Sequence, residues 1–362
     1  TITVGENIYL AKEPAEHGIV NWEKLYSNTQ KVLDKYHLDV PPRSIVRHLG
    51  VSKMQMTEIA KALAEDAKIL ILDEPTSALA ETEIEQLMEI LRGLKEHGVT
   101  CIYISHKLDE FFQITDSITV LRDGKTVITQ PTKEMNTESL VRHMVGREMK
   151  ERFPKGNRKP GEVILEVEDL HALDPQDASY EALKGVSFKL RRGEILGIAV
   201  LMGSGRTELV MTLFGEYAKI NQGKIRLEGR EITVRNSREA MQHGISLVPE
   251  DRKLHGLVLM QSILRNISLA NLDRFASFMR VDDLAELKES MEFAQSLSIK
   301  APNLHAAADS LSGGNQQKVV ISKWLMSRPK ILIMDDPTRG IDVGTKYEIY
   351  KIMNDLSEKG IG

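Results

Sequence analysis

Residues 311–338 read LSGGNQQKVVISKWLMSRPKILIMDDPT, and residues 49–76 read LGVSKMQMTEIAKALAEDAKILILDEPT. Laid together without a gap at an offset of 262, the two stretches are identical at 12 of 28 positions. A second match, at an offset of 259, sets Asn7, Ile8 and Leu10 against Asn266, Ile267 and Leu269. These identities, in one order, indicate an internal repeat, and we expect one order of elements to occur twice.

Length and composition agree with a folded chain of two domains. At 362 residues the chain exceeds twice the usual domain length of roughly 150 residues. Hydrophobic residues make up 41% and charged residues 28%, which excludes a mainly disordered chain. The net charge of −4 gives no global sign of a nucleic-acid binder. Cys101 is the single cysteine, which excludes an intrachain disulfide and fits a reducing cytosol.

Two further features concern membranes and chain ends. The apolar run Ile195–Met202 spans eight residues, far short of the roughly 20 that a membrane helix needs, so we expect no membrane span. The chain begins at Thr1, without an initiator Met or a signal core, and we expect a processed or partial chain.

A stretch without apolar periodicity separates the two copies. Residues 147–159 carry six basic and two acidic residues together with Pro154 and Gly156. A patch for nucleic acid or lipid headgroups is the alternative, but Phe153 is the one aromatic in the run, which favours a solvated linker. We therefore expect a first domain over residues 1–145, a linker over 146–161 and a second domain over 162–362.

The coarse pattern is α/β. Short apolar runs rich in isoleucine predict buried parallel strands at Ile69–Leu72, Cys101–Ile104, Ile195–Val200, Ile245–Val248 and Ile331–Met334. Helical patterns alternate with them at Thr57–Ala64, Thr82–His97, Glu208–Phe214 and Gln316–Met326. This alternation predicts a mainly parallel sheet with helices on both faces, built twice.

A candidate phosphate-binding loop, residues 200–207, lies between a predicted strand and a predicted helix. Its glycines allow backbone N–H groups to turn toward phosphate oxygens at a helix N-terminus, and its threonine hydroxyl is placed for Mg²⁺. The alternative is a strand-to-helix turn with no ligand. The predicted nucleotide-binding residues are Gly203, Ser204, Gly205, Arg206 and Thr207.

Two positions of this loop depart from the usual pattern. Val200 stands where the first glycine belongs, and Arg206 replaces a lysine. Since a guanidinium is a wide planar fork and an ammonium is a compact point charge, arginine cannot simply take the lysine's place among phosphates. We therefore predict a nucleotide site that is weakened or inert.

Acidic pairs follow two of the predicted strands, as Asp73-Glu74 and Asp335-Asp336. The first acid of such a pair can organise Mg²⁺, and the second can orient or deprotonate the water that attacks a γ-phosphate. The prediction is that Asp73 and Asp335, with Thr207, are metal ligands and that Glu74 and Asp336 are catalytic. A solvated turn after the strand is the alternative. The occurrence of an acidic pair in both copies of the repeat argues against it.

A histidine and a glycine-rich segment complete the candidate residues. His106 follows the predicted strand at 101–104, and at that sheet edge it can contact a γ-phosphate, although a lone histidine is often a surface or capping residue. Residues 311–318 precede a predicted helix, where a hydroxyl and free N–H groups can bind an anion, the alternative being an ordinary serine N-cap. The predicted nucleotide-binding residues of that segment are Ser312, Gly313, Gly314 and Gln316.

These motifs, in this order, resemble the nucleotide-binding subunits of ATP-binding-cassette transporters. More narrowly, residues 201–209, 248–253, 311–318 and 337–344 resemble the tandem ATPase subunit of bacterial importers of ribose, xylose, arabinose and galactosides. The resemblance implies two P-loop NTPase cassettes in tandem, each with a helical subdomain, that bind ATP and Mg²⁺. It also implies a peripheral place on the cytoplasmic face of the membrane, with no nucleic acid as partner.

The resemblance further implies partners and an asymmetry. The partners are permease subunits, faced by the segment near Pro249–Lys253, and through them a periplasmic or lipid-anchored sugar-binding protein. In such proteins each ATP lies between the phosphate loop of one cassette and the glycine-rich signature of the other. One site here would combine intact residues, and the other would combine Val200, Arg206 and Asp336 with residues 49–53, which lack the signature pattern.

The repeat offsets place two functional parts outside the chain. The second cassette's histidine would fall at position 368, and the first cassette's phosphate loop would precede Thr1, so we expect this segment alone to hydrolyse ATP poorly. Two alternative functions stay open: the ATPase subunit of a nucleoside importer, and a permease-free tandem ATPase acting on ribosomes or DNA.

Overall fold

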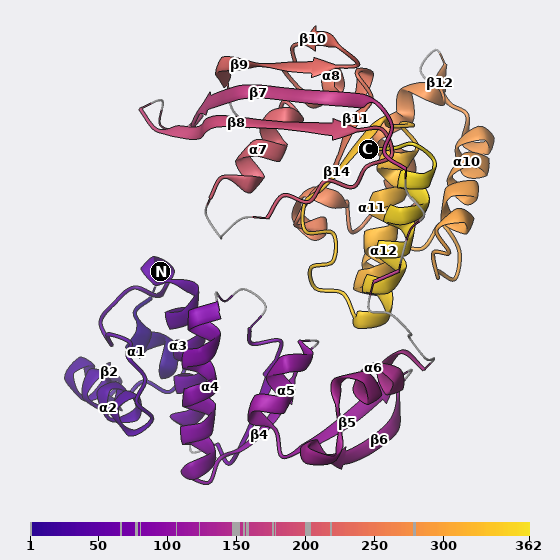
Figure 1. Ribbon diagram of the computed structural model, residues 1–362. Coiled ribbons are helices and arrows are strands. Elements are labelled where there is room, and N and C mark those ends of the chain that lie inside the picture. The colour runs from indigo at the N-terminus through magenta and orange to yellow at the C-terminus, as the bar shows by residue number, and fades with distance from the viewer. Residues whose placement is uncertain are drawn as a thin grey trace. The chain divides into compact units, whose positions relative to one another are not determined.

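The computed structural model describes the chain apart from residues 1, 66, 77, 78, 80, 106, 123, 147–152, 155, 157, 158, 176, 178, 200–203, 218, 278 and 279, and the side chains of residues 16, 51 and 219. The chain divides into two compact units, Thr1–Glu148 and Met149–Gly362, here called unit 1 and unit 2 (Figure 1). The division falls within the stretch expected to be a linker. Each unit is described by itself.

Unit 1 begins with a helical group and continues into strands. The group comprises α1 (Val4–Ile8), the hairpin of β1 (Ala15–Glu16) and β2 (Ile19–Val20), α2 (Trp22–Lys35), the short helix η1 (Val46–His48) and α3 (Val51–Leu63). There follow β3 (Ile69–Asp73), α4 (Glu81–Glu96), β4 (Thr100–Ile104), α5 (Leu108–Ile114), β5 (Ser117–Arg122), β6 (Lys125–Pro131), η2 (Thr132–Glu134) and α6 (Thr137–Val145).

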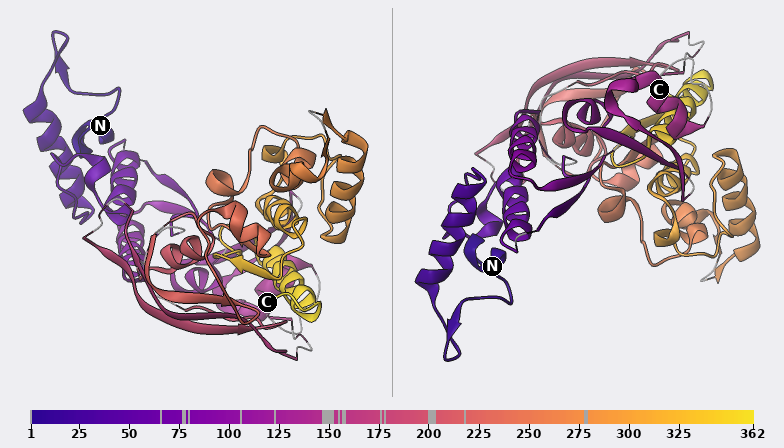
Figure 2. Two further views of the ribbon diagram at one scale, coloured as in Figure 1. Left: turned by 90° about the horizontal axis from the view of Figure 1, so that it is seen from above. Right: turned by 90° about the horizontal axis from the view of Figure 1, so that it is seen from below.

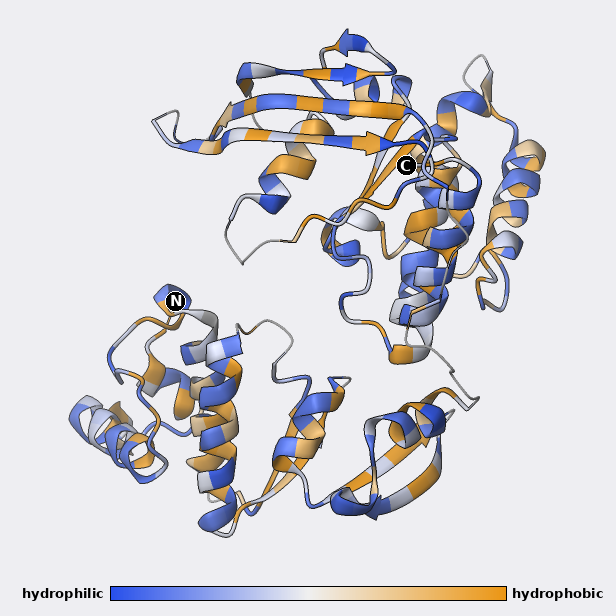
Figure 3. Ribbon diagram, viewed as in Figure 1, coloured by the Kyte–Doolittle hydropathy of each residue, from blue (hydrophilic) through white to orange (hydrophobic). Residues whose placement is uncertain are grey.

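Apolar spacing explains the centre of unit 1. Helix α4 buries Leu87, Leu91 and Leu94 along one face, and it ends before Gly98, whose φ of +79° no longer fits a helix. Strands β3 and β4 pair in parallel, with Ile69 opposite Thr100, and are largely hydrophobic (Figure 3). The core of unit 1 joins these strands to α3 and α4.

Unit 2 combines an antiparallel sheet, a parallel pair of strands and a helical group. The sheet has the order β10-β9-β7-β8, from β7 (Val163–Leu173), β8 (Glu181–Arg191), β9 (Lys219–Leu227) and β10 (Arg230–Ile232). It forms one outer layer, with α7 (Arg206–Leu213) against its inner face (Figure 2). Helix α8 (Ser237–Gln242) leads to β11 (Ile245–Val248), which pairs in parallel with β14 (Ile331–Met334).

The helical group of unit 2 surrounds one buried helix. It comprises η3 (Arg252–Gly256), a single π-helical turn, then α9 (Ile263–Ser268), η4 (Leu269–Arg274), the hairpin of β12 (Ala276–Ser277) and β13 (Arg280–Val281), α10 (Asp283–Ser296), η5 (Ala308–Ser310), α11 (Gly313–Leu325) and α12 (Val343–Glu358). Val319, Val320 and Ile321 of α11 are fully buried. Because α9, α10 and α12 all contact α11, this helix is the centre of the group.

Two expectations about the sheets are wrong. The largest sheet of unit 2 is antiparallel, and each parallel pairing that the structure describes joins two strands. The expected strand at Ile195–Val200 is not formed over its described residues, 195–199. A strand exists through hydrogen bonds to a neighbour, and here a cavity of about 340 Å³ is lined both by Ile195, Leu196 and Ile198 and by β14.

The helix starts also differ from expectation. Helices α3 and α11 begin at Val51 and Gly313, before the expected starts at Thr57 and Gln316, because each begins directly after an extended N-cap residue, Gly50 or Ser312. Apolar periodicity marks where a helix packs and does not mark where its backbone hydrogen bonds begin.

Two glycines with the same backbone angle allow a stability test. Gly215, after α7, and Gly229, between β9 and β10, both have φ +78°. A Cβ on Gly215 would lie 2.6 Å from the backbone nitrogen of Asn236, whereas a Cβ on Gly229 would meet nothing within 4 Å. We expect Gly229→Ala to lower the free energy of unfolding by about 1 kcal/mol, from backbone strain alone. Gly215→Ala should cost about 3 kcal/mol in urea denaturation because it adds overlap with the backbone. Equal losses would contradict this.

Candidate functional site

The phosphate loop of unit 2 enters α7 through a glycine. Gly205 is the N-cap of α7 with φ +91°, a conformation that residues with a Cβ rarely adopt, and a Cβ there would lie 3.2 Å from the carbonyl oxygen of Ala182. This turn places Arg206 and Thr207 in the first turn of the helix, after the exposed Ser204. Gly203 and Val200 lie outside the described residues.

Asp335 is the acid that this loop meets. It follows β14, its backbone N–H donates to the carbonyl of Val248 (3.0 Å), and its side chain is 2% exposed. The Thr207 hydroxyl donates to Asp335 Oδ2 at 3.3 Å, and Arg206 Nε lies 2.8 Å from Oδ1. The second contact is an ion pair that is not aligned as a hydrogen bond. The structure therefore brings together three of the predicted site residues.

The electrostatics at Asp335 contain opposing effects. Burial raises the pKa of the Asp335 carboxyl above its ordinary value, and the neighbouring Asp336 acts in the same direction. The contacts with Arg206 and Thr207 oppose this shift. Asp336 itself is exposed and has φ +38°, and its carbonyl accepts from the N–H of Arg339 (3.1 Å). The second acid thus starts a tight turn.

The acidic pair of unit 1 has similar backbone geometry. Asp73 ends β3 and is exposed, and Glu74 follows with φ +49°. The N–H of Glu74 donates to the carbonyl of Ile104 at 2.9 Å, so this acid lies beside the carboxyl end of β4. His106 is outside the described residues, and its predicted contact with a γ-phosphate stays a prediction.

A buried carboxylate beside the predicted histidine was missed by the sequence reasoning. Glu110, 4% exposed, accepts from the hydroxyls of Tyr103 (2.7 Å) and Ser105 (2.9 Å). Burial and this carboxylate raise the pKa of the Tyr103 hydroxyl. Lys107 Nζ lies 3.7 Å from Glu110 Oε1 and donates to the carbonyl of Thr76 at 2.9 Å. Glu110 therefore contacts the residues on both sides of position 106, Ser105 and Lys107, and Lys107 also bonds to the segment that follows Glu74.

The serine of the glycine-rich segment is not an ordinary cap. Ser312 occupies the N-cap position of α11, yet its side chain makes no capping hydrogen bond. Its oxygen instead accepts from Asn315 Nδ2 at 3.0 Å, while Asn315 Oδ1 accepts from the N–H of Lys300 at 2.8 Å. Since that bond uses the serine oxygen as acceptor, the hydroxyl proton is left to donate to a ligand.

The other predicted residues of this segment are placed by packing. Gln316 is 4% exposed and donates to the carbonyl of Ala308 (3.1 Å), so its side chain points into the protein. A Cβ on Gly313 would lie 2.7 Å from Arg252 Nη2, and a Cβ on Gly314 would overlap the side chain of Thr345. A side chain at Gly314 would therefore collide with the short side chain of Thr345, and one at Gly313 would require the Arg252 guanidinium to move.

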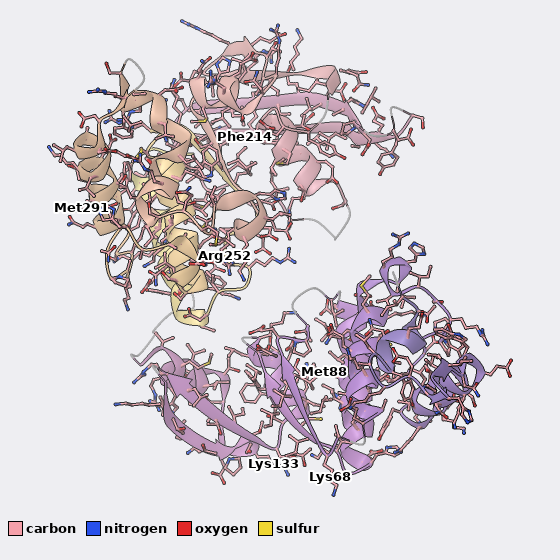
Figure 4. The ribbon with its side chains drawn as sticks, turned by 180° about the vertical axis from the view of Figure 1, so that it is seen from behind. Lys68, Met88, Lys133, Phe214, Arg252 and Met291 are labelled. Carbon is pink, nitrogen blue, oxygen red and sulfur yellow. The ribbon has the colours of Figure 1, made fainter. Side chains whose placement is uncertain are left out.

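Arg252 and Glu250 are further residues of this site that the sequence reasoning did not assign. Arg252 (Figure 4) donates through Nη1 to the carbonyl of Arg339 (2.7 Å) and through Nη2 to that of Gly340 (3.0 Å). Glu250 pairs with Arg206 (3.4 Å) through one oxygen and with Arg339 through the other. The signal that could have found them is the run of charged residues directly after β11.

A glycine that opens a helix beside a buried aspartate at the carboxyl end of a strand defines a phosphate-binding protein of the α/β class. Residues 183–339 match the ABC transporter family. The xylose import ATP-binding protein XylG of Thermoanaerobacter pseudethanolicus is 50% identical over 99% of this chain and 71% of its own length. The L-arabinose transport ATP-binding protein AraG of Geobacillus stearothermophilus is 47% identical over 100% of this chain and 71% of its own length.

The chain belongs to the ATP-binding proteins of ABC transporters, which are ATPases. Among solved structures, one titled RNase-L Inhibitor is similar in fold, with a TM-score of 0.59, 19% identity, and coverage of 99% of this chain and 63% of that one. Within the described part of the chain, no helix is long and apolar enough to cross a membrane.

The contacts of Arg252 predict its effect on the loop after Asp336. Arg252→Ala removes two hydrogen bonds from a charged donor to the carbonyls of Arg339 and Gly340. We expect the amides of residues 339–342 to exchange hydrogen about 10- to 100-fold faster, measured by mass spectrometry. The exposed Arg235, changed to Ala, is the matched control and should leave this exchange unaltered. Unchanged exchange in Arg252→Ala would show that the loop does not depend on it.

Proposed function

We propose that this protein is the ATP-hydrolysing subunit that energises a bacterial sugar importer. The observation that carries the proposal is the identity of 47–50% over nearly the whole chain to proteins named for xylose import or L-arabinose transport. We also propose that residues 1–145 and 162–362 belong to two successive cassettes, joined by residues 146–161.

Matching element bounds in the two units support the tandem arrangement. At the offset of 262, η1 corresponds to η5, α3 to α11 and α4 to α12, each with identical bounds. Two isolated β-bridges also correspond, Thr3 with Ile45 and Ser262 with Ala307, at the offset of 259 for the first residue of each bridge and 262 for the second. These correspondences support a repeat of structure as well as of sequence.

Individual hydrogen bonds repeat as well. The N–H of Thr100 donates to the carbonyl of Lys68 (2.9 Å), and at the same offset the N–H of Gly362 donates to that of Lys330 (3.0 Å). The two second acids, Glu74 and Asp336, share a positive φ. These contacts support the assignment of unit 1 to the rear part of a cassette.

A difference in exposure supports the same assignment. In β3, Ile69 is 60% exposed, whereas the corresponding Ile331 in β14 is 2% exposed. In unit 2 this residue packs in a core with residues of β7, β9 and α7, and the described residues of unit 1 form no counterpart of those elements. The chain spans 71% of the length of the xylose-import relative. The apolar face of unit 1 is what a cassette would present where its front part packs.

The proposed chemistry assigns one role to each residue. Glu74 polarises the attacking water, Asp73 organises Mg²⁺ and His106 contacts the γ-phosphate. Ser312 donates its hydroxyl proton, and Gly313 and Gly314 offer backbone N–H groups, to phosphate oxygens. Mg²⁺, when bound with ATP, neutralises charge on the phosphates. Asp336, in the position of Glu74, makes the site of unit 2 the weaker one.

The proposal includes partners and a location. The segment after β11 would face permease subunits, and through them a periplasmic or lipid-anchored sugar-binding protein, at the cytoplasmic face of the membrane. Asp251 supports this segment by accepting from the N–H groups of Lys253 (2.8 Å) and Leu254 (3.0 Å), which leaves the Leu254 side chain 73% exposed. Val258 and Met260 of the same segment are also exposed, at 46% and 84%, and a group of exposed apolar side chains suits a protein partner.

Glu74→Gln tests the hydrolytic role. In the protein assembled with its permease, we expect ATP turnover to fall about 100-fold or more, because an amide cannot accept the proton of the attacking water. ATP binding, measured by equilibrium dialysis, should persist. Glu85→Gln, an exposed acid on α4, is the matched control and should turn over normally. Normal turnover in Glu74→Gln would contradict the assignment.

The transported class is tested with the same assembly in proteoliposomes. We expect ATP turnover to rise severalfold when a pentose-loaded binding protein is added, because closure of the permease complex drives hydrolysis. Stimulation by a nucleoside-loaded binding protein, without response to pentoses, would instead support a nucleoside importer. Salt-sensitive binding to ribosomes or DNA without membrane association would support the remaining alternative.

A further inference from the structure

We propose that the nucleotide site of unit 2 binds triphosphate without Mg²⁺, because the guanidinium of Arg206 takes the place of the metal ion at Asp335. The proposal rests on the proposed function, since it assumes that residues 204–207 bind nucleotide phosphates. It concerns the cation requirement of that site, which the family assignment leaves open.

The donor set at Asp335 does not fit Mg²⁺. This ion takes near-octahedral oxygen ligands at about 2.0–2.1 Å and usually keeps several waters. Arg206 Nε is 2.8 Å from one carboxylate oxygen of Asp335, and the Thr207 hydroxyl is 3.3 Å from the other. Asp335 and Arg206 both line the cavity beside β14, but the Asp335 side chain is only 2% exposed and is covered by Arg206, so an ion in that cavity would have to displace the guanidinium to reach the carboxylate.

Arg206 is held from a second direction. Its Nη2 lies 3.4 Å from Glu250 Oε2, so the guanidinium spans two carboxylates that come from different strand ends. Glu250 is itself fixed because its other oxygen pairs with Arg339. A divalent ion at Asp335 would have to displace a cation bound on both sides. The single ammonium of a lysine lacks the planar fork that makes both contacts at once.

Unit 1 offers the contrast within the same chain. Asp73 corresponds to Asp335 at the offset of 262, and Asp73 is exposed where Asp335 is buried. Among the described residues, unit 1 has no counterpart of α7, so no arginine covers Asp73, whereas Arg206 of α7 covers Asp335 in unit 2.

The arginine can supply charge to phosphates in place of the ion. A guanidinium stays protonated at all physiological pH values and binds phosphate oxygens through its N–H groups. About a third of the Arg206 side chain is exposed, at the start of α7, where the first-turn N–H groups also favour anions. A triphosphate at this position would meet a fixed positive charge before any metal binds.

The test is binding of a fluorescent ATP analogue to the 362-residue chain, in Mg²⁺ and in EDTA. We expect dissociation constants in the two buffers to agree within about threefold, because the phosphate charge is balanced by the protein. In a parallel experiment with Mn²⁺, the protein–nucleotide complex is desalted rapidly and its metal is measured. The wild-type complex should retain nucleotide with almost no manganese.

Two variants assign the result to this site. Arg206→Glu reverses the charge and should abolish binding in EDTA, with folding checked by circular dichroism. In Arg206→Lys, the side chain at position 206 no longer pairs with Asp335 and Glu250 at once. We expect this variant to retain manganese with the nucleotide and to bind the nucleotide at least about tenfold more weakly in EDTA. Arg235→Ala, an exposed charge change, is the matched control and should behave as wild type.

The outcomes separate this proposal from the proposed function. Wild-type binding that requires Mg²⁺, with one manganese retained per nucleotide, would overturn the metal-free site while leaving an ATP-binding protein. Binding in EDTA that survives Arg206→Glu, or no binding in either buffer, would overturn it too, because the nucleotide then does not use Arg206. The proposed ATPase function is judged separately, by the turnover of Glu74→Gln.

Discussion

The buried carboxylate of Asp335 is the constraint on which the geometry of unit 2 depends. A charge removed from water costs several kcal/mol unless it is paired, so this aspartate needs a cation close by. Arg206 provides it, and Glu250 and Arg339 then extend the network into the loop after β14. These ion pairs form one network. It fixes the relative positions of the phosphate loop, the segment after β11 and the turn after Asp336.

The glycine-rich segment depends on the same network through packing. Arg252 donates to the carbonyls of Arg339 and Gly340, and a Cβ on Gly313 would lie 2.7 Å from its Nη2. A side chain at Gly313 would thus push on the loop that carries Asp336. Arg252 thus links the segment that carries Ser312 to the loop that carries Asp336. This link is a physical basis for coupling between the conformations of the two segments.

How far the sequence predicted the structure depended on the range of the contacts involved. Strands β3, β4, β11 and β14 and helix α4 were predicted nearly to the residue, because buried strands and amphipathic helices leave a local apolar pattern. The antiparallel sheet of unit 2 was missed, and the strand at Ile195–Val200 was expected and is absent over its described residues. Strand pairing is a long-range property, and a short apolar run carries no information about its neighbour.

The sequence by itself determined the repeat, the acids at the strand ends, the family and the candidate residues of the phosphate loop, since each is a pattern of residue types at fixed spacing. The tertiary structure alone decided what those residues touch. Arg206 meets Glu250 and Asp335 across 44 and 129 positions of the chain, Ser312 leaves its hydroxyl proton available, and Gln316 turns inward. Such partners come together when strands and helices pack, and spacing along the chain does not record which side chains packing makes neighbours.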